Sequence, residues 1–399
     1  MCVALVFLRE KRAVALTWQR RGRVARAAEP QRDKVRHRAL PSHRRRSIFG
    51  GEVYKLLSSR LCVLLLAAFI LFEVGSCIGV GIEQVSGSET EYRRYTTLYA
   101  GEITEENAAC LLMEKQEIDG IVNQYQAMLS AAREGAISAE EWQAYVLDYA
   151  RAYERQGAIT RVVARLGVLA ANESGSVPWL LYDTGWQRLL NKDADLVLIA
   201  LVVFLSSVIF PIEYRHTAGG AIAPLVSSTK KGRLHVLFAK CGLAAVVALI
   251  LTLLSQLCAL LPLIWREEWI LPSAPLSSLA LFSVSPDMTI GAYVVLRMLL
   301  QLGSMVLFAV SVCLLSCLYR REAFTLLSVG ALLLLLRVVA LTGLRALRCL
   351  DFLNFWTLTP FLQIEGVGAG DVTLYLFTLC AITGALFYLA TRRERVAAA

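Results

Sequence analysis

The chain has 399 residues, of which 56% are hydrophobic and 18% charged, and its mean hydropathy is +0.54. Its continuous apolar runs of about twenty residues are too numerous to be buried in one soluble core of this size. The composition therefore excludes an ordinary soluble domain and predicts an all-α polytopic membrane protein. A membrane β-barrel is disfavoured because the apolar runs are continuous rather than alternating.

The net charge of +9 is unevenly distributed along the chain. Residues 1–60 are strongly basic, whereas residues 83–194 carry an excess of acidic side chains. A basic flank beside a first span is typical of a cytoplasmic N-terminus. Residues 1–46 lack apolar periodicity and are predicted to be a basic, disordered tail. No nucleic-acid partner is expected, because the arginines of the tail lack interleaved aromatic residues and a readable fold.

Six apolar segments are predicted to span the membrane. Residues 47–82 combine a short amphipathic lead with the first span, and residues 195–399 hold the other five. The predicted spans cover residues 61–82, 195–212, 236–264, 290–318, 323–341 and 372–390. The predicted architecture is therefore six transmembrane helices with one large insert.

The charged residues inside these apolar segments include Glu73, Arg297 and Arg337, whereas Asp195 and Lys240 lie at or near the starts of theirs. A charged side chain in lipid is expensive, so an intramembrane charge is expected to face the helix bundle or a polar lumen. For Glu73, a structural hydrogen bond to a neighbouring helix is favoured over a contact with a substrate.

Residues 83–194 form a long polar insert between the first two spans. Two amphipathic stretches flank Gly135, and Ser138 and Glu141 have the spacing of a capping box at the start of the second helix. The pattern predicts an extracytoplasmic helical hairpin. The stripe formed by Trp142, Tyr145, Tyr149 and Tyr153 is predicted to be its buried core.

The basic residues at the ends of the spans set the predicted topology. Pairs of arginines follow the fourth and sixth spans, and Lys230, Lys231 and Arg233 lie between the second and third. These clusters fall on one side if both termini are cytoplasmic, and the insert then lies outside. Residues 343–371 are too polar to span and are predicted to form an outer hairpin. Only Cys110 and Cys349 are placed to face an oxidising side, and their spacing does not require a disulfide.

The sequence offers little catalytic chemistry. It has no phosphate-binding loop, no zinc-binding HExxH motif and no nucleophile elbow. Residues 368–371 read Gly-Ala-Gly-Asp, as in intramembrane aspartyl proteases, but that chemistry needs a second membrane-embedded aspartate. The Tyr-Asp pair of this sequence, Tyr182-Asp183, lies in the polar insert, and Asp195 at the start of the second span is the one other candidate for the second aspartate. A turn with a helix N-cap at Asp371 is therefore favoured over a protease site.

The layout resembles that of ABC-2-type transporter permeases, the membrane subunits of ATP-binding-cassette exporters, in the variant with a large outer insert between spans 1 and 2. Four stretches carry the resemblance, and their order is more specific than any one of them: residues 54–60, 92–106, 213–240 and 343–371. Together they cover most of residues 50–395. The tail has no counterpart in the family pattern.

The resemblance implies that residues 213–235 form a cytoplasmic coupling loop that docks on a separate ATPase. The candidate residues of this coupling site are Glu213, Gly219, Gly220, Lys230, Lys231, Gly232, Arg233 and Lys240. From the residues alone, the two adjacent glycines permit a tight turn. The cationic cluster is equally well explained by the positive-inside rule together with lipid headgroup contact.

The resemblance further implies a permease subunit that is not itself an enzyme and holds no metal or other cofactor, with ATP bound by a partner. The implied partners are an ABC ATPase subunit, a second permease chain, identical or similar, and the lipid bilayer. The implied location is the plasma (cytoplasmic) membrane of a bacterium, with both termini inside. The alternative is a signalling or mechanotransmission protein whose outer insert reports to a partner without moving cargo.

Overall fold

The computed structural model describes residues 48–82, 86–171, 177, 179–191, 195–211, 232–279, 288–341, 352 and 369–396. Their regular structure is helical apart from two short strands, β1 (Gly101–Glu102) and β2 (Trp179–Leu180), which pair antiparallel. The chain is thus an all-α protein in its described parts. The tail 1–46 and most of the predicted outer hairpin 343–371 lie outside the described residues.

Five helices among the described residues are long and apolar enough to cross a membrane. They coincide with five of the predicted spans to within a few residues, although the last one is longer than predicted. They are α3 (Arg60–Ile82), α10 (Gly232–Trp265), α11 (Ile290–Tyr319), α12 (Glu322–Leu341) and α16 (Ala369–Val396). The chain is therefore a multi-pass membrane protein.

The remaining predicted span, residues 195–212, contains a shorter helix, α8 (Leu196–Val208). Its 13 residues extend about 20 Å at 1.5 Å per residue, less than the roughly 30 Å hydrocarbon core of a bilayer. Asp195 caps its N-terminus, its carboxylate accepting a hydrogen bond from the backbone N–H of Leu198 at 2.9 Å. Six spans remain a prediction from the sequence.

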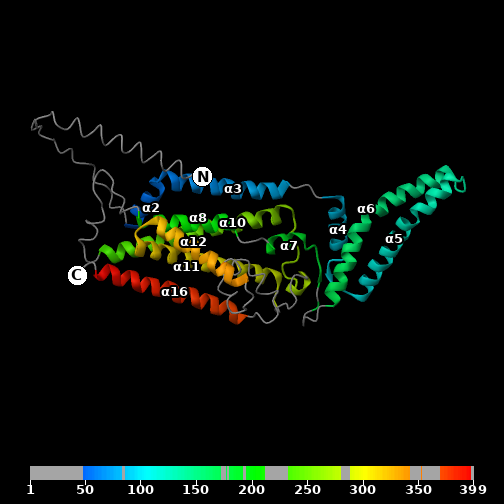
Figure 1. The fold of residues 1–399 in the computed structure, drawn as a ribbon. Helices are drawn as coiled ribbons and strands as arrows, with labels where there is room; N and C mark the ends of the chain where they lie inside the picture. Colours follow the sequence, from blue (N-terminus) through cyan, green and yellow to red (C-terminus); the bar gives the residue numbers. More distant parts are fainter. Residues whose placement is uncertain are drawn as a thin grey trace, which may run out of the picture. The chain divides into compact units, whose positions relative to one another are not determined.

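The long helices lie side by side around α10 and α11 (Figure 1). α10 contacts α3, α8, α11 and the amphipathic lead helix α2 (Ile48–Ser58), while α11 contacts α8, α12 and α16. Small side chains such as Ala244, Ala248 and Ala309 are fully buried between them. Small residues let helix backbones approach closely, which is how helices associate in lipid without a hydrophobic driving force.

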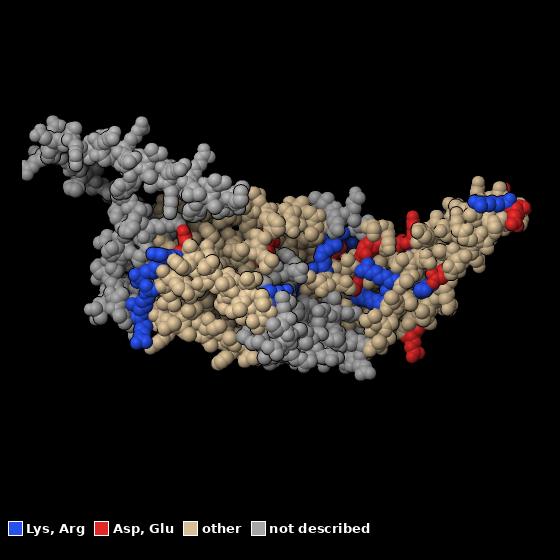
Figure 2. Space-filling view, in the orientation of Figure 1, with Lys and Arg blue, Asp and Glu red and all other residues tan. Residues whose placement is uncertain are grey.

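Charged side chains are concentrated at the two ends of the bundle. On the face shown in Figure 2, the long helices are almost free of charge, with Lys and Arg at the end near α2 and mixed charges at the end near α4 (Gly87–Leu98). We call the end where α10 begins the loop side, because the predicted loop 213–235 leads into the first turn of α10. We call the opposite end, where α3 and α10 finish, the insert side.

Residues 83–194, which we call the insert, contain two long helices that pack against each other, α5 (Glu105–Arg133) and α6 (Ala139–Ala170). Gly135 adopts a φ of +72° in the turn, a conformation that glycine reaches without strain. The predicted capping box is confirmed: the Ser138 hydroxyl accepts from the Glu141 N–H at 3.2 Å, and the Glu141 carboxylate accepts from the Ser138 N–H at 2.8 Å.

The prediction that the aromatic stripe is the core of the insert is wrong. Trp142, Tyr145 and Tyr149 are only half-buried and Tyr153 is 62% exposed, although neighbouring rings stack. The buried core lies nearer the bundle, where α4 packs against α6. That core includes Tyr92, Tyr95, Leu111, Ile118, Ile159, Val162 and Tyr182. The stripe fails as a core because two helices alone cannot cover both sides of a ring.

The stability of the insert is expected to reside in this buried core and not in the aromatic stripe. Ile159 is fully buried, so Ile159→Ala should destabilise the insert by about 2–5 kcal/mol through lost burial and a residual cavity. Tyr153→Ala, six residues earlier on the same helix, should cost under about 1 kcal/mol because the ring is largely solvated. Hydrogen exchange of α5 and α6 in the purified protein measures both; a larger effect of Tyr153→Ala would restore the stripe as the core.

Candidate functional site

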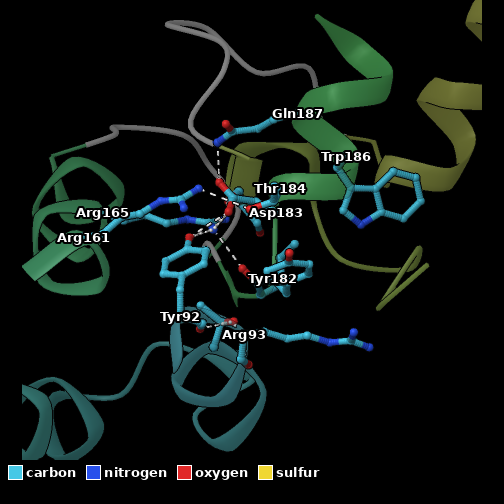
Figure 3. Close-up of polar contacts among 12 residues, drawn as sticks. Tyr92, Arg93, Arg161, Arg165, Tyr182, Asp183, Thr184, Trp186 and Gln187 are labelled. Carbon is cyan, nitrogen blue, oxygen red and sulfur yellow. Dashed lines mark hydrogen bonds and ion pairs between the residues drawn. The ribbon is translucent and has the colours of Figure 1, made fainter. Parts of the chain in front are cut away.

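A buried guanidinium joins the insert to the membrane bundle. Arg165 of α6 lies 2.6 Å from Asp183 Oδ1 and donates to the Tyr92 hydroxyl at 2.9 Å. It also donates to the backbone carbonyls of Leu181 at 2.8 Å and Ser278 at 2.7 Å. Figure 3 shows Arg165, Asp183 and Tyr92 pointing toward one another. We call these five groups the Arg165 junction.

The Arg165 junction is built from segments distant in the sequence. Tyr92 comes from α4 and Asp183 precedes α7 (Thr184–Leu190), whereas Ser278 belongs to the short 3-10 helix Leu276–Leu279 that precedes α11. The side chains of Arg165 and Asp183 are 7% and 3% exposed. A buried charge is tolerated only when it is paired and hydrogen-bonded, so all three segments must be in place together. Burial raises the pKa of Tyr92 to about 12, which keeps its hydroxyl protonated as a donor to Asp183.

A second, more exposed layer covers the Arg165 junction. The Glu89 carboxylate pairs with Arg161 at 2.7 Å and accepts hydrogen bonds from the hydroxyls of Thr184 at 2.6 Å and Tyr182 at 2.9 Å. The Arg161 guanidinium carbon also lies 3.9 Å from the centre of the Tyr92 ring. Burial acts to raise the pKa of Glu89, but the hydrogen bonds and the nearby arginine outweigh it and hold that pKa below its usual range.

Helix α7 carries the connection from the Arg165 junction into the bundle. Its Trp186 donates through Nε1 to the carbonyl of Ile270 at 3.1 Å and packs against Trp269 with ring centres 4.8 Å apart. Gly185 touches the end of α10 so closely that an added Cβ would lie 2.7 Å from the Glu268 carboxylate. Leu263 would be closer still. Only glycine therefore allows α7 to lie where it does.

A cavity of about 420 Å³ lies between α3, α7 and the end of α10. We call it the large cavity. Its polar lining includes Glu73, Ser76, Arg188, Asn191 and Glu268, and its apolar lining includes Val80, Ala259, Pro262 and Leu263. Such a volume is within the range of small-molecule sites in proteins.

The buried charges of the large cavity are carboxylates. Glu73 and Glu268 are 3% and 2% exposed. Glu268 lies 3.2 Å from Arg266, which also donates to the carbonyl of Val80 at 2.9 Å and so ties α3 to the end of α10. Arg188 approaches Glu268 less closely, at 3.7 Å, and its side chain is 38% exposed.

A cavity of about 60 Å³, which we call the small cavity, is lined by residues of α7, α10 and α11 and by Asp195, which precedes α8. Its polar lining comprises Asp195, Ser255, Gln256, Arg297 and Gln301. Ser255 donates to Asp195 at 3.1 Å, Gln256 donates to Gln301 at 3.2 Å, and Arg297 donates to the carbonyl of Leu190 at 2.8 Å. Gln256 Oε1 is buried and accepts no hydrogen bond from the described residues, which makes it an acceptor for water or another guest.

The two cavities share Leu189 and Ala259 in their linings. They are therefore neighbours, separated by one apolar side chain of α7 and one small side chain of α10. Helix α7 lines both cavities, and it begins directly after Asp183 of the Arg165 junction. The insert and the polar interior of the bundle are thus connected through seven residues.

Two of the three predicted intramembrane charges line a cavity of the bundle, each a different one. Glu73 lines the large cavity and Arg297 the small one, so both face the bundle interior as predicted. Arg337 is exposed on α12 and does not line either cavity.

Most of the predicted coupling site lies outside the described residues, namely Glu213, Gly219, Gly220, Lys230 and Lys231. Gly232 and Arg233 form the beginning of α10. Lys240 is fully buried and donates to the carbonyl of Ile209 at 3.3 Å, with its amine 4.5 Å from the centre of the Phe210 ring. Lys240 therefore joins α10 to the end of α8 and is not exposed for docking.

The residues that the sequence analysis missed are Arg165, Asp183, Glu268 and the polar side chains of the small cavity. The sequence does not distinguish a buried charge from a solvated one within a polar insert, where most charged side chains are solvated. Glutamines and serines within spans were the one available signal, since polar side chains in lipid need partners on neighbouring helices.

Comparison with protein-family models, with curated proteins and with solved structures gave no match. The case for a function therefore rests on the geometry of the junction and the two cavities and on the sequence.

The Arg165 junction predicts a large penalty for losing its acidic partner. Asp183→Asn should destabilise the insert by about 3–5 kcal/mol, because it leaves the buried Arg165 charge uncompensated. Asp148→Asn is the matched control: its pair with Arg151 is 3.5 Å long and exposed, so the loss should stay below about 1 kcal/mol. Hydrogen exchange of α4 and α6 measures both, and equal effects would contradict a structural role for the junction.

The lowered pKa of Glu89 predicts an acid-sensitive junction. The stability that Glu89 contributes should be complete above its ordinary pKa of 4.5 and should be lost as the pH falls through the lower, folded-state pKa. Protection of α4 from hydrogen exchange should therefore decrease below about pH 4.5. In Glu89→Gln this component should disappear from the pH profile, whereas Glu154→Gln on the exposed face of α6 should retain it. An unchanged profile in Glu89→Gln would refute the assignment.

Proposed function

We propose that this chain is the membrane subunit of a transporter in which a separate ATPase supplies the energy. The proposal includes six spans, cytoplasmic termini, an insert outside the cell and a second permease chain beside this one. The observation that carries it is the pair of adjacent polar cavities within a bundle of otherwise apolar helices. A protein that only anchors a domain needs no such interior.

The polar lining of the cavities supports the proposal on energetic grounds. Polar and charged side chains inside a membrane bundle are costly and tend to mark the path of a substrate or ion. Here they come from α3, α7, α10 and α11, and they lie close to the insert side. A substrate moving between the paired bundles would meet these groups before leaving the membrane.

The loop side supports a separate source of energy. The sequence contains no phosphate-binding loop, so ATP chemistry requires a partner. Arg320, Arg321, Arg392 and Arg393 fall at the ends of α11 and α16, and Arg393 donates to the carbonyl of Leu318, which places these two ends together. Basic residues on one side of the bundle favour a cytoplasmic location for that side. The buried Lys240 would transmit force from the coupling loop 213–235 to α8 and α10.

The second candidate function is transmission of a signal from the insert to the bundle without cargo. The Arg165 junction favours it, because a rigid connection between an outer hairpin and the membrane helices is what a transmitter requires. This candidate makes no use of the cavities. It predicts a partner outside and no associated ATPase.

An association experiment tests the transporter proposal. The tagged full chain, purified from its native membranes, should recover a protein that carries a phosphate-binding loop, together with ATPase activity. Arg233→Glu should reduce both by at least about tenfold, because it reverses a charge at the start of α10, beside the coupling loop. Arg133→Glu, an exposed charge reversal at the tip of the hairpin, is the matched control and should leave both unchanged.

Two results would contradict the proposal. Absence of ATPase activity from the wild-type preparation would refute energy coupling through a partner. Recovery that falls equally with Arg133→Glu would place the partner on the insert side and favour the transmitter instead.

A further inference from the structure

A further cavity, of about 260 Å³, lies between α11, α12 and α16, and we call it the apolar cavity because its lining is mostly leucine, isoleucine, valine and phenylalanine. In α12 and α16 only 11% of the apolar stretch is buried within the bundle, compared with 50% in α11. Leu332 of α12 and Ile382 of α16 line the cavity and are themselves 51% and 49% exposed. The apolar cavity therefore opens on a surface that the bilayer surrounds.

The wall of the apolar cavity favours a hydrocarbon guest. Among its few polar side chains, Ser311 donates to the carbonyl of Leu307 at 2.9 Å, one turn earlier in α11. Thr378 likewise donates to the carbonyl of Leu374 at 2.8 Å within α16. These hydroxyls are already hydrogen-bonded, and water finds few partners in a cavity with such a lining. An acyl chain from the surrounding bilayer meets no such penalty.

Arginines gather where α11, α12 and α16 meet on the loop side. Arg320 and Arg321 separate α11 from α12, and Arg392 and Arg393 belong to the last turns of α16. We call these four residues the arginine cluster. Arg393 donates to the carbonyl of Leu318, so the ends of α11 and α16 lie together. Residues 320–322 and 392–395 hold five arginines and two glutamates, hence a net charge of +3, which attracts anionic headgroups at a bilayer surface.

The arginine cluster lies a short distance beyond the apolar cavity along two of its helices. Leu315 of α11 lines the cavity and precedes Arg320 by five residues. Leu386 of α16 also lines it and precedes Arg392 by six residues. At 1.5 Å per residue these separations are about 8 and 9 Å, similar to the roughly 5–8 Å depth of each headgroup region of a bilayer. A lipid with a chain in the cavity therefore has its phosphate near the arginines.

We propose that the apolar cavity and the arginine cluster together bind an anionic phospholipid, with one acyl chain between α12 and α16 and the phosphate beside the arginines. Guanidinium groups suit this headgroup because they bind phosphate through two parallel N–H donors. The inference goes beyond the proposed function, since the site requires neither a cargo nor an ATPase. The bound lipid connects two helices that bury little of their own surface in the bundle.

A lipid titration tests the inference. The full chain in a neutral detergent is titrated with dioleoyl phosphatidylglycerol or with dioleoyl phosphatidylcholine, which has the same chains and no net charge, and bound lipid is counted by native mass spectrometry. The first phosphatidylglycerol should bind at least about tenfold more tightly than the first phosphatidylcholine. Free glycerol phosphate should not displace it, because the chain supplies the apolar contact. Equal affinities for the two lipids, or displacement by glycerol phosphate at equal concentration, would overturn the proposal.

Two variants with matched controls locate the two ends of the lipid, and every side chain they replace is exposed, so the fold should be retained. Arg321→Gln combined with Arg392→Gln should lower the preference for phosphatidylglycerol at least about fivefold, whereas Arg133→Gln at the tip of the hairpin should not. Leu332→Trp fills the apolar cavity and should weaken binding of both lipids at least about fivefold. Leu335→Trp, on the same helix but outside the lining, should not. Unchanged binding in the double variant or in Leu332→Trp would refute the assigned position.

A second copy of the chain is the other occupant that the same spectra can reveal. Absence of saturable phosphatidylglycerol binding, together with a dimer that Leu332→Trp dissociates and Leu335→Trp does not, would refute the lipid site. The apolar cavity would then belong to an interface between two copies.

Discussion

The buried guanidinium of Arg165 is the contact on which the arrangement of the insert side depends. It connects α6 to Asp183, Leu181 and Ser278, residues that belong to the segments leading into α7 and α11. A hydrogen-bonded ion pair with so little solvent access tolerates few alternative geometries, because displacing either partner exposes an unmatched charge to an apolar surrounding. The position of α7 and, with it, the walls of both cavities follow from that constraint.

The packing of the bundle differs between the loop side and the insert side. Towards the loop side, small side chains and backbone-directed bonds, such as that from Ser316 to the Ser207 carbonyl at 2.7 Å, hold α8, α10 and α11 closely together. Towards the insert side, larger polar side chains replace them and leave space. Hydrogen bonds between helices therefore hold the helices together on the loop side. On the insert side the hydrogen-bonded side chains surround cavities that water or a small molecule can occupy.

Five of the spans, the capping box at Ser138 and the inward position of Glu73 and Arg297 could be predicted because each depends on local pattern or on the penalty for charge in lipid. The Arg165 junction could not be predicted, because its partners are separated by as many as 113 residues. Nothing in the sequence distinguishes Arg165 from the solvated arginines of the insert. The prediction that the aromatic stripe is a buried core failed for a related reason. Periodicity identifies a face of a helix, but it does not say whether a third element covers that face.

Helix α10 runs without a break from Gly232, within the segment 213–235 that the sequence predicts to be a coupling loop, to Trp265, three residues after Pro262 of the large cavity. Its 34 residues measure about 50 Å, well over the thickness of the hydrocarbon core. Such a rod is stiff along its axis, so a push at its first turn arrives at its last turn as a shift of similar size. Pro262, which lacks a backbone N–H, lies one turn before the end of α10. Because a helix bends most readily at a proline, a displacement along the axis of α10 is expected to become a lateral displacement at Pro262.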